Sequence, residues 1–171
     1  MSGDVAPLTT QFDRVVHEID DAVVKFEIVD DEPIIVDANH AFRDIFSPDM
    51  KRVIGLALND LIVPTGKQDE AATFDERTAA GRSNVAFVTR STTNGNRTFL
   101  YRGIPTTDNY GVAIYTDVTG ELERQETLTD IVELAEQVAA EATTVRTQTA
   151  AATIKAKAQR LLQFTDSSLP E

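Results

Sequence analysis

The sequence predicts an α+β protein in which two groups of antiparallel strands are separated by short helices and followed by a long helix. Short segments rich in β-branched and aromatic residues alternate with segments whose apolar residues recur every three or four positions. The interval 119–164 contains no proline and, after Gly120, no glycine. It therefore favours a continuous helix.

The first half of the chain predicts a helix, a β-hairpin and several helical stretches. Acidic turn residues alone separate the first two β-branched segments, which indicates a hairpin. Ser47-Pro48 and Gly81 are typical helix stops. The expected elements are a helix over 8–20, strands Ala22–Val29 and Pro33–Asp37, a helix over 39–46, short helical turns over 50–63 and a helix over 68–81.

Three strands are expected in the second half, over 83–91, 97–104 and 110–117. The turn signals Asn94-Gly95-Asn96 and 107–109 separate them. Because both connections are short, we expect neighbouring strands to be antiparallel.

An apolar seam in the C-terminal segment predicts a coiled-coil homodimer. Its members step alternately by three and four residues: Leu128, Ile131, Ala135, Val138, Ala142 and Val145. Beyond Val145 the large apolar residues leave this register, which is compatible with a stutter, a helical hairpin or an end that needs another partner. The orientation of the dimer stays open.

Composition limits the function. The formal net charge is −12, so direct nucleic-acid binding is not expected. No segment resembles a membrane span or a secretory signal, and we expect a cytoplasmic protein without a membrane partner. The acidic, lysine-poor composition resembles that of haloarchaeal proteins, whose repelling carboxylates are screened by high salt.

Three local patterns, over roughly 12–125, resemble a PAS domain, as found in haloarchaeal sensor kinases and transducers. They are PIIVDANHAF at 33–42, Gly55 with Leu61, and the exit motif Asp117-Val118-Thr119. The resemblance implies a five-stranded antiparallel sheet with short helices on one face. It also implies four regions: an N-terminal cap helix (1–20), the PAS-like domain (21–118), a signalling or coiled-coil helix (119–165) and a disordered tail (166–171).

Three polar residues have expected structural roles. Asn39 follows a strand and is placed to cap the next helix through its side-chain oxygen. Asp117 and Thr119 lie where the last strand becomes the long helix, and short side chains there can accept hydrogen bonds from its first turn. The resemblance makes Asp117 and Thr119 the expected signal-transmission residues, an interpretation compatible with simple capping.

The sequence lacks the residues of most catalytic and cofactor chemistry. Two histidines, His17 and His40, are too few for a three-histidine metal site, and we expect neither a metal ligand nor an enzyme. The absence of cysteine excludes covalent flavin or bilin attachment. The sequence leaves open a non-covalent small aromatic or heterocyclic ligand of unknown identity.

The resemblance implies a space between sheet and helices that either holds a small molecule or is filled by side chains. Arg90 and Arg102 are the strand residues suited to bind an anion, although we expect both to be exposed. The predicted pocket residues are Phe42, Ile45, Phe46, Leu58, Phe74, Phe87, Phe99, Tyr101 and Tyr115.

Two functions follow from these observations. The first is a sensor module that binds a small ligand non-covalently and relays its state through the C-terminal helix to a sensor kinase, transducer or regulator. The alternative is a dimerisation or assembly module with a filled core.

Overall fold

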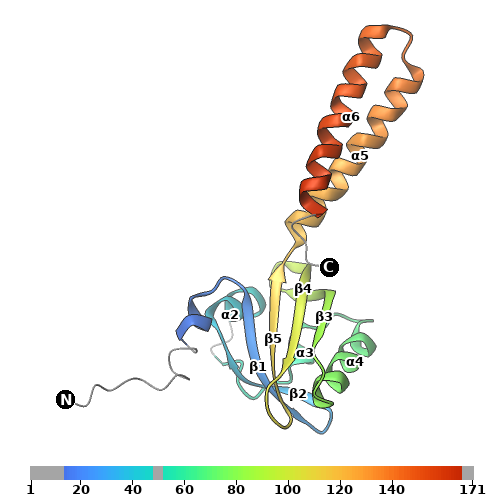
Figure 1. Cartoon of the computed structure of the whole chain (residues 1–171). Helices are drawn as coiled ribbons and strands as arrows, with labels where there is room; N and C mark the ends of the chain where they lie inside the picture. Colours follow the sequence, from blue (N-terminus) through green and yellow to red (C-terminus); the bar gives the residue numbers. More distant parts are fainter. Residues whose placement is uncertain (1–13, 48–51, 167–171) are drawn as a thin grey trace, which may run out of the picture. The chain divides into compact units, whose positions relative to one another are not determined.

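The computed structural model describes residues 14–47 and 52–166. The chain divides between Asp117 and Val118 into two compact units (Figure 1). We call the first the sheet domain and the second, which contains two helices, the helical hairpin.

The sheet domain contains one five-stranded antiparallel sheet, as predicted. Its strands lie in the order β2-β1-β5-β4-β3, and each neighbouring pair is antiparallel. The strands are β1 (Ala22–Val29), β2 (Glu32–Ala38), β3 (Asn84–Thr92), β4 (Gly95–Pro105) and β5 (Tyr110–Asp117). The central strand, β5, is therefore the last strand in the sequence. It pairs with both β1 and β4 and so joins the two predicted groups of strands.

The first hairpin turns at Asp30 and Asp31, which have φ values of 50° and 66°. Positive φ at both central residues gives the backbone twist that a two-residue hairpin loop needs, and aspartate tolerates it better than most residues. The predicted hairpin is confirmed.

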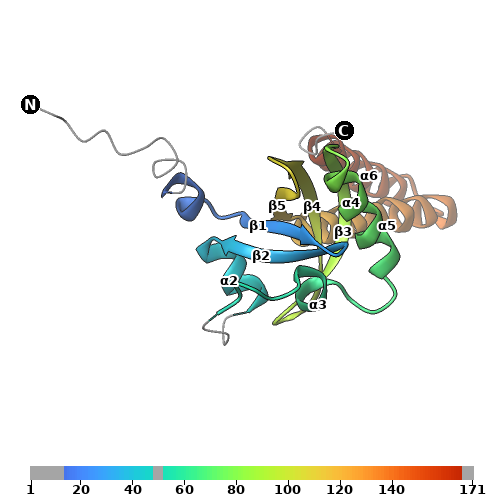
Figure 2. The ribbon, with the colours of Figure 1, turned by 90° about the horizontal axis from the view of Figure 1, so that it is seen from below.

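Helices cover one face of the sheet, which we call the inner face. These are α2 (His40–Phe46), α3 (Leu58–Ile62) and α4 (Gln68–Ala79). Figure 2 shows α2 and α3 on one side of the strands. Between these helices and the sheet lies an apolar core in which Phe26, Phe42 and Phe99 are almost completely buried.

Asn39 joins three parts of the sheet domain. Its Oδ1 accepts hydrogen bonds from the amides of Phe42 and Val23, both at 2.9 Å, so it caps α2 as predicted and also holds β1. Its Nδ2 donates to the carbonyls of Val16 and Asp21. Residues 14–18 form a helical turn, and the remainder of the predicted N-terminal helix, 8–13, lies outside the described residues.

Gly55 lets the segment before α3 pair with β2. Its φ of +90° is a conformation that favours glycine. Its amide donates to the Ile35 carbonyl at 2.7 Å, and the Ile35 amide donates to the Leu56 carbonyl at 2.9 Å. These bonds hold the segment before α3 against β2 and so place α3 beside the apolar core.

The C-terminal region forms a helical hairpin, one of the alternatives that the loss of register beyond Val145 left open, and not one continuous helix. It contains α5 (Thr119–Glu141) and α6 (Val145–Asp166), which pack against each other (Figure 1). Ala142 leaves the helical conformation with ψ of 127°, and the Thr144 hydroxyl accepts the Thr147 amide. Thr144 thus caps α6, and this capping favours a new helix over continuation. Of the predicted tail 166–171, Asp166 belongs to α6 and 167–171 lie outside the described residues.

The predicted dimer seam is divided between two surfaces of the helical hairpin. Leu128 and Ala135 are buried, whereas Val138 is 48% and Val145 79% exposed. Ile131 and Ala142 are half-buried. Part of the predicted seam therefore packs against α6 of the same chain and not against a second chain. Among the described residues, neither helix is sufficiently long and apolar to cross a bilayer.

Candidate functional site

Eight of the nine predicted pocket residues meet between the sheet and its helices. Phe42, Phe46, Leu58, Phe99, Tyr101 and Tyr115 belong to the buried core, and Ile45 and Phe74 pack against it. Phe87 does not join them, because it is 49% exposed. It alternates along β3 with the buried Val88, so its side chain lies on the opposite, outer face of the sheet.

The aromatic side chains form a continuous series of ring contacts. Ring centroids lie 5.7 Å apart for Phe46 and Tyr115, 5.3 Å for Tyr115 and Tyr101, and 5.1 Å for Tyr101 and Phe74. Tilted and edge contacts at these distances add packing energy to the burial of the rings. The series links α2 to α4 across β4 and β5.

Little space is left beside these rings. The interior cavity has a volume of about 10 Å³ and is bounded by α3, α4 and the inner faces of β1, β3, β4 and β5. That volume suffices for about one water molecule. A flat heterocycle therefore needs the helices to move before it can enter.

Arg90 extends into this interior, contrary to the expectation that it would be exposed. The residue is 2% exposed. Its Nη1 donates to Glu70 Oε1 at 3.1 Å and to the Thr89 carbonyl at 2.8 Å. Its Nε is buried and has no hydrogen-bond partner among the described residues. A buried guanidinium with an unused donor is costly and is therefore a candidate binding group.

Asp75 of α4 faces the same cavity. Its Oδ2 accepts a hydrogen bond from Asn59 Nδ2 of α3 at 2.7 Å. Burial raises the pKa of the Asp75 carboxyl from 3.8 to about 6, although the Asn59 hydrogen bond and the nearby Arg90 charge lower it. Asp75 can therefore change its protonation state close to neutral pH.

Two phenols complete the polar cluster, which consists of Asn59, Glu70, Asp75, Arg90, Tyr101 and Tyr115. Burial raises the pKa of Tyr115 to about 12, while Arg90 opposes this shift. Burial, with the charge of Tyr115, also raises the pKa of Tyr101 above its usual range. Both hydroxyls remain protonated at neutral pH. Gly103 allows the Tyr101 position, since a Cβ there would collide with the phenol oxygen.

Sequence reasoning missed the Asn59, Glu70 and Asp75 parts of this cluster. Asp75 and Glu70 are two among many acidic residues, and nothing local separates them from solvated ones. A signal did exist for Arg90, because it lies two residues after Val88 and period-2 alternation puts both on one face.

The exit of the sheet is fixed by an ion pair. Arg97 Nη1 of β4 donates to Asp117 Oδ2 at the end of β5, at 2.8 Å. Val118 occupies the N-cap position of α5, between Asp117 and Thr119. The ion pair with Arg97 orients the end of β5 against β4.

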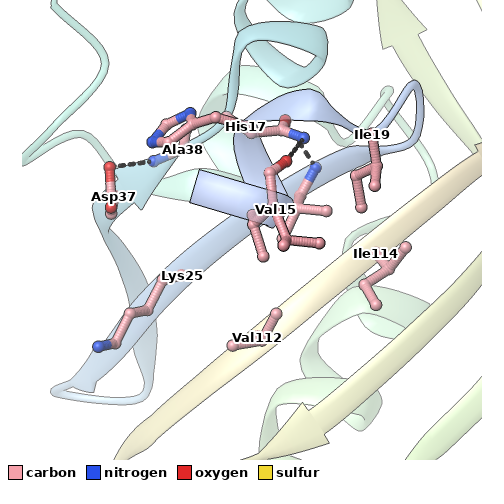
Figure 3. A pocket seen from close by; sticks show the side chains of 11 residues that line it. Val15, His17, Ile19, Lys25, Asp37, Ala38, Val112 and Ile114 are labelled. Carbon is pink, nitrogen blue, oxygen red and sulfur yellow. Dashed lines mark hydrogen bonds between the residues drawn. The ribbon is translucent and has the colours of Figure 1, made fainter. Parts of the chain in front are cut away.

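A second hollow lies on the outer face of the sheet, beside residues 14–18. It has a volume of about 240 Å³, and Figure 3 shows Val15, Ile19, Val112 and Ile114 around it. Lys25 and Asp37 also line it, but both are exposed. Because no buried charged group lines this hollow, it is a less specific site than the interior cluster.

The part of the chain that the structure describes contains no candidate metal-binding site of clustered side chains. No group of three or more His, Cys, Asp or Glu side chains is arranged there to hold a metal ion. His17 and His40 are both exposed. Arg102, which was expected to be exposed, is half-buried outside the core, with its Nη1 3.5 Å from the Thr116 hydroxyl.

The sheet, its covering helices and an interior polar cluster define a small domain of the α+β class, with five antiparallel strands. Residues 19–123, more than half of the chain, match the family described as PAS fold. The chain belongs to this family and contains a PAS-type sensory domain. No curated protein matches it in sequence.

Solved structures share the fold at low identity. An RNA-binding light-oxygen-voltage receptor has a TM-score of 0.61 and 19% identity over 80% of this chain, which spans 40% of that receptor's length. The Rhodobacter sphaeroides LOV protein has a TM-score of 0.54 and 14% identity, covering 93% of this chain and 98% of its own. The PAS domain of the Cronobacter turicensis RpfR quorum-sensing receptor, in complex with BDSF, has a TM-score of 0.52 and 19% identity, covering 61% and 99%.

Proposed function

We propose that this protein is a signal-transduction sensor that binds a small anionic ligand in the interior of its PAS domain. The observation that carries the proposal is Arg90, a buried guanidinium whose Nε has no hydrogen-bond partner among the described residues. A carboxylate or phosphate would supply that partner, and arginine binds such groups in a fixed planar geometry.

The remainder of the ligand would contact aromatic rings. Phe74, Tyr101 and Tyr115 lie around the cavity that Arg90 enters. A small aromatic or heterocyclic body would pack against these rings, and the phenols would orient it. We propose no covalent attachment and no catalytic reaction.

Binding must open the interior, because the cavity of about 10 Å³ admits no such molecule as it stands. Asn59 of α3 and Asp75 of α4 are joined by the 2.7 Å hydrogen bond that closes one side. We propose that the ligand anion competes with Glu70, the ion-pair partner of Arg90, and that α3 and α4 move outward. Ligand binding would thereby change the shape of the domain.

The change would leave the domain through β5. Tyr115 lines the same cavity as Arg90, and Asp117 lies two residues further along the same face of β5. Asp117 is held by Arg97, which is the register partner of Arg90 on the neighbouring strand. We propose that Asp117 and Thr119 transmit the signal to α5.

The receiver of the signal is proposed to be another protein. We propose a cytoplasmic homodimer that acts on a sensor kinase, transducer or regulator, without nucleic-acid or membrane contact. The net charge of −12 also supports a haloarchaeal or other high-salt setting.

Ligand binding is tested by native mass spectrometry of the purified chain and by thermal shift with carboxylates, including C12:0, which a related PAS domain is described to bind. We expect the parent and Arg102→Met, an outer-face control, to respond. Arg90→Met should lose the response, and Arg90→Lys should retain part of it. An equal response from Arg90→Met would contradict the proposed site.

The alternative is an assembly module with a filled core, which the small interior cavity favours. It predicts no co-purifying molecule, no thermal shift with any carboxylate and an interior that stays closed. It also predicts that removing the interior charges leaves every partner interaction intact.

A further inference from the structure

The contact between α5 and α6 is made largely by small side chains. Ala135 of α5 and Ala151 and Ala158 of α6 are buried, with Leu128 as the large member. Alanine allows two helices to approach closely, but it removes little apolar surface from water. The helical hairpin therefore has a modest apolar core of its own.

Larger apolar residues lie beside this seam and are exposed. Leu134 is 59%, Val138 48% and Ile154 51% exposed, and Ile131 is half-buried. Ile131, Val138 and Ile154 each follow a buried seam residue by three positions, which turns them to one side of their helix. Because α5 and α6 are antiparallel and face each other, that side is the same face of the hairpin in both helices (Figure 1). We call it the apolar face.

The opposite face of the hairpin carries an ion pair. Glu136 and Lys155 form an ion pair across it, with Nζ and Oε1 2.6 Å apart. The hairpin is thus amphipathic as a unit, with one side suited to water and the other to a partner.

The two helices carry opposite charge. Seven carboxylates and one arginine lie in α5, whereas α6 has four basic side chains and one carboxylate at its end. A partner that offers a basic helix to α5 and an acidic helix to α6 would be complementary along both edges of the apolar face. A second copy of this hairpin offers both.

We infer that the apolar face binds the same face of a second copy, so that two hairpins form a four-helix bundle with α5 of each chain beside α6 of the other. This inference rests on the homodimer proposed above and specifies its surface. A two-fold axis along the helices gives this arrangement. An axis across them would place acidic α5 against acidic α5, which charge repulsion opposes.

The first test is the mass of the full chain by sedimentation equilibrium. The parent is expected to be a dimer, which Val138→Glu and Ile154→Glu weaken by at least tenfold in dissociation constant. Ala140→Glu and Thr153→Glu add the same charge at exposed positions off the face and should leave the constant within about threefold. A monomeric parent, or equal weakening by both pairs, overturns the inference.

The second test measures orientation. The chain has no cysteine, so Thr143→Cys places a single spin label in the connection between the helices. The inferred bundle puts the two labels at the same end, within about 20 Å given helix spacings of 8–10 Å. The other axis separates them by about 35 Å, the length of α5 at 1.5 Å per residue. The longer distance overturns the inferred symmetry.

The inferred dimer and the proposed ligand site can be disproved independently of each other. The carboxylate thermal shift of the sheet domain is expected to persist in Val138→Glu. A dimer that forms through the apolar face without any ligand response would contradict only the ligand site.

Discussion

The sheet domain buries charge among aromatic rings, whereas the helical hairpin buries alanine and leaves larger apolar residues exposed. Arg90 and Asp75 lie inside a core that has almost no free volume. Ala151 and Ala158 form most of the α6 side of the hairpin seam. A folded unit gains stability by burying apolar surface and loses it by desolvating charge. Each unit is thus less stable than it could be at the site where we propose that it binds, a ligand in the sheet domain and a second copy in the hairpin.

The largest effect expected is on the buried cluster. Arg90→Met removes the cation that favours the Asp75 carboxylate and the Glu70 ion pair, and we expect a loss of about 3 kcal/mol at pH 8. Urea denaturation followed by tyrosine fluorescence measures it, because all three tyrosines belong to the sheet domain.

The double variant Arg90→Met, Asp75→Leu sharpens this result. It replaces the buried charges with apolar groups and should recover most of the lost stability while losing the ligand response. If it remains as unstable as Arg90→Met alone, the cluster contributes to folding in a way that charge desolvation does not explain.

A second prediction concerns pH. The folded-state pKa of Asp75, about 6, lies above its ordinary value of 3.8, so the native state binds the proton more tightly than the unfolded chain. This contribution to stability is fully present below about pH 4 and is lost as pH rises through 6. Relative to Asp75→Asn, which keeps the shape, the parent should lose about 2–3 kcal/mol between pH 4 and pH 7.

Measuring the difference between the two proteins cancels the titration of the other acidic residues. Parallel stability curves for the parent and Asp75→Asn would show that the carboxyl is hydrated rather than buried. In the ligand assay, protonation of Asp75 removes a negative charge near Arg90, so carboxylate binding should be tighter at pH 5.5 than at pH 8.

The hairpin gives the third prediction. Ala151→Leu inserts a large side chain where α5 and α6 approach closely, and overpacking should destabilise the hairpin by about 1–3 kcal/mol. Hydrogen exchange of the α6 amides is the measurement, and the exposed Ala156→Leu is its control. Equal protection in both variants would mean that α5 and α6 are not closely packed at Ala151.

Local sequence signals were sufficient for most of the sheet domain. Alternating β-branched residues located all five strands, and the position of Asn39 after a strand predicted the cap that the structure shows. Burial at single positions was harder. Phe87 and Arg90 lie in the same strand, and residue type alone suggested the reverse of their actual exposure. Strand alternation beside Val88 overrides hydrophobicity there.

The break between α5 and α6 could not be found by searching for proline and glycine. Thr144 caps α6 with a hydroxyl, a signal that is present in the sequence but weaker than a helix-breaking residue. The acidic neighbours of Arg90 could not be predicted, for another reason. Glu70 and Asp75 come from α4, and only the tertiary packing of α4 on the sheet selects them from the other acidic residues.

The smallest effect contrasts the ion pairs of the two units. Glu136 and Lys155 in the hairpin are 2.6 Å apart, closer than the 3.1 Å between Glu70 and Arg90. The hairpin pair is nevertheless expected to matter less, because its side chains are 53% and 37% exposed while that of Arg90 is 3% exposed. Water screens the exposed pair, and fixing two long side chains costs entropy. Lys155→Met should change hairpin stability by less than about 0.5 kcal/mol, and 1 M salt should remove even that difference. A loss as large as that of Arg90→Met would mean that Lys155 is desolvated in the folded protein, as it would be if a partner covered the polar face of the hairpin instead of the apolar one.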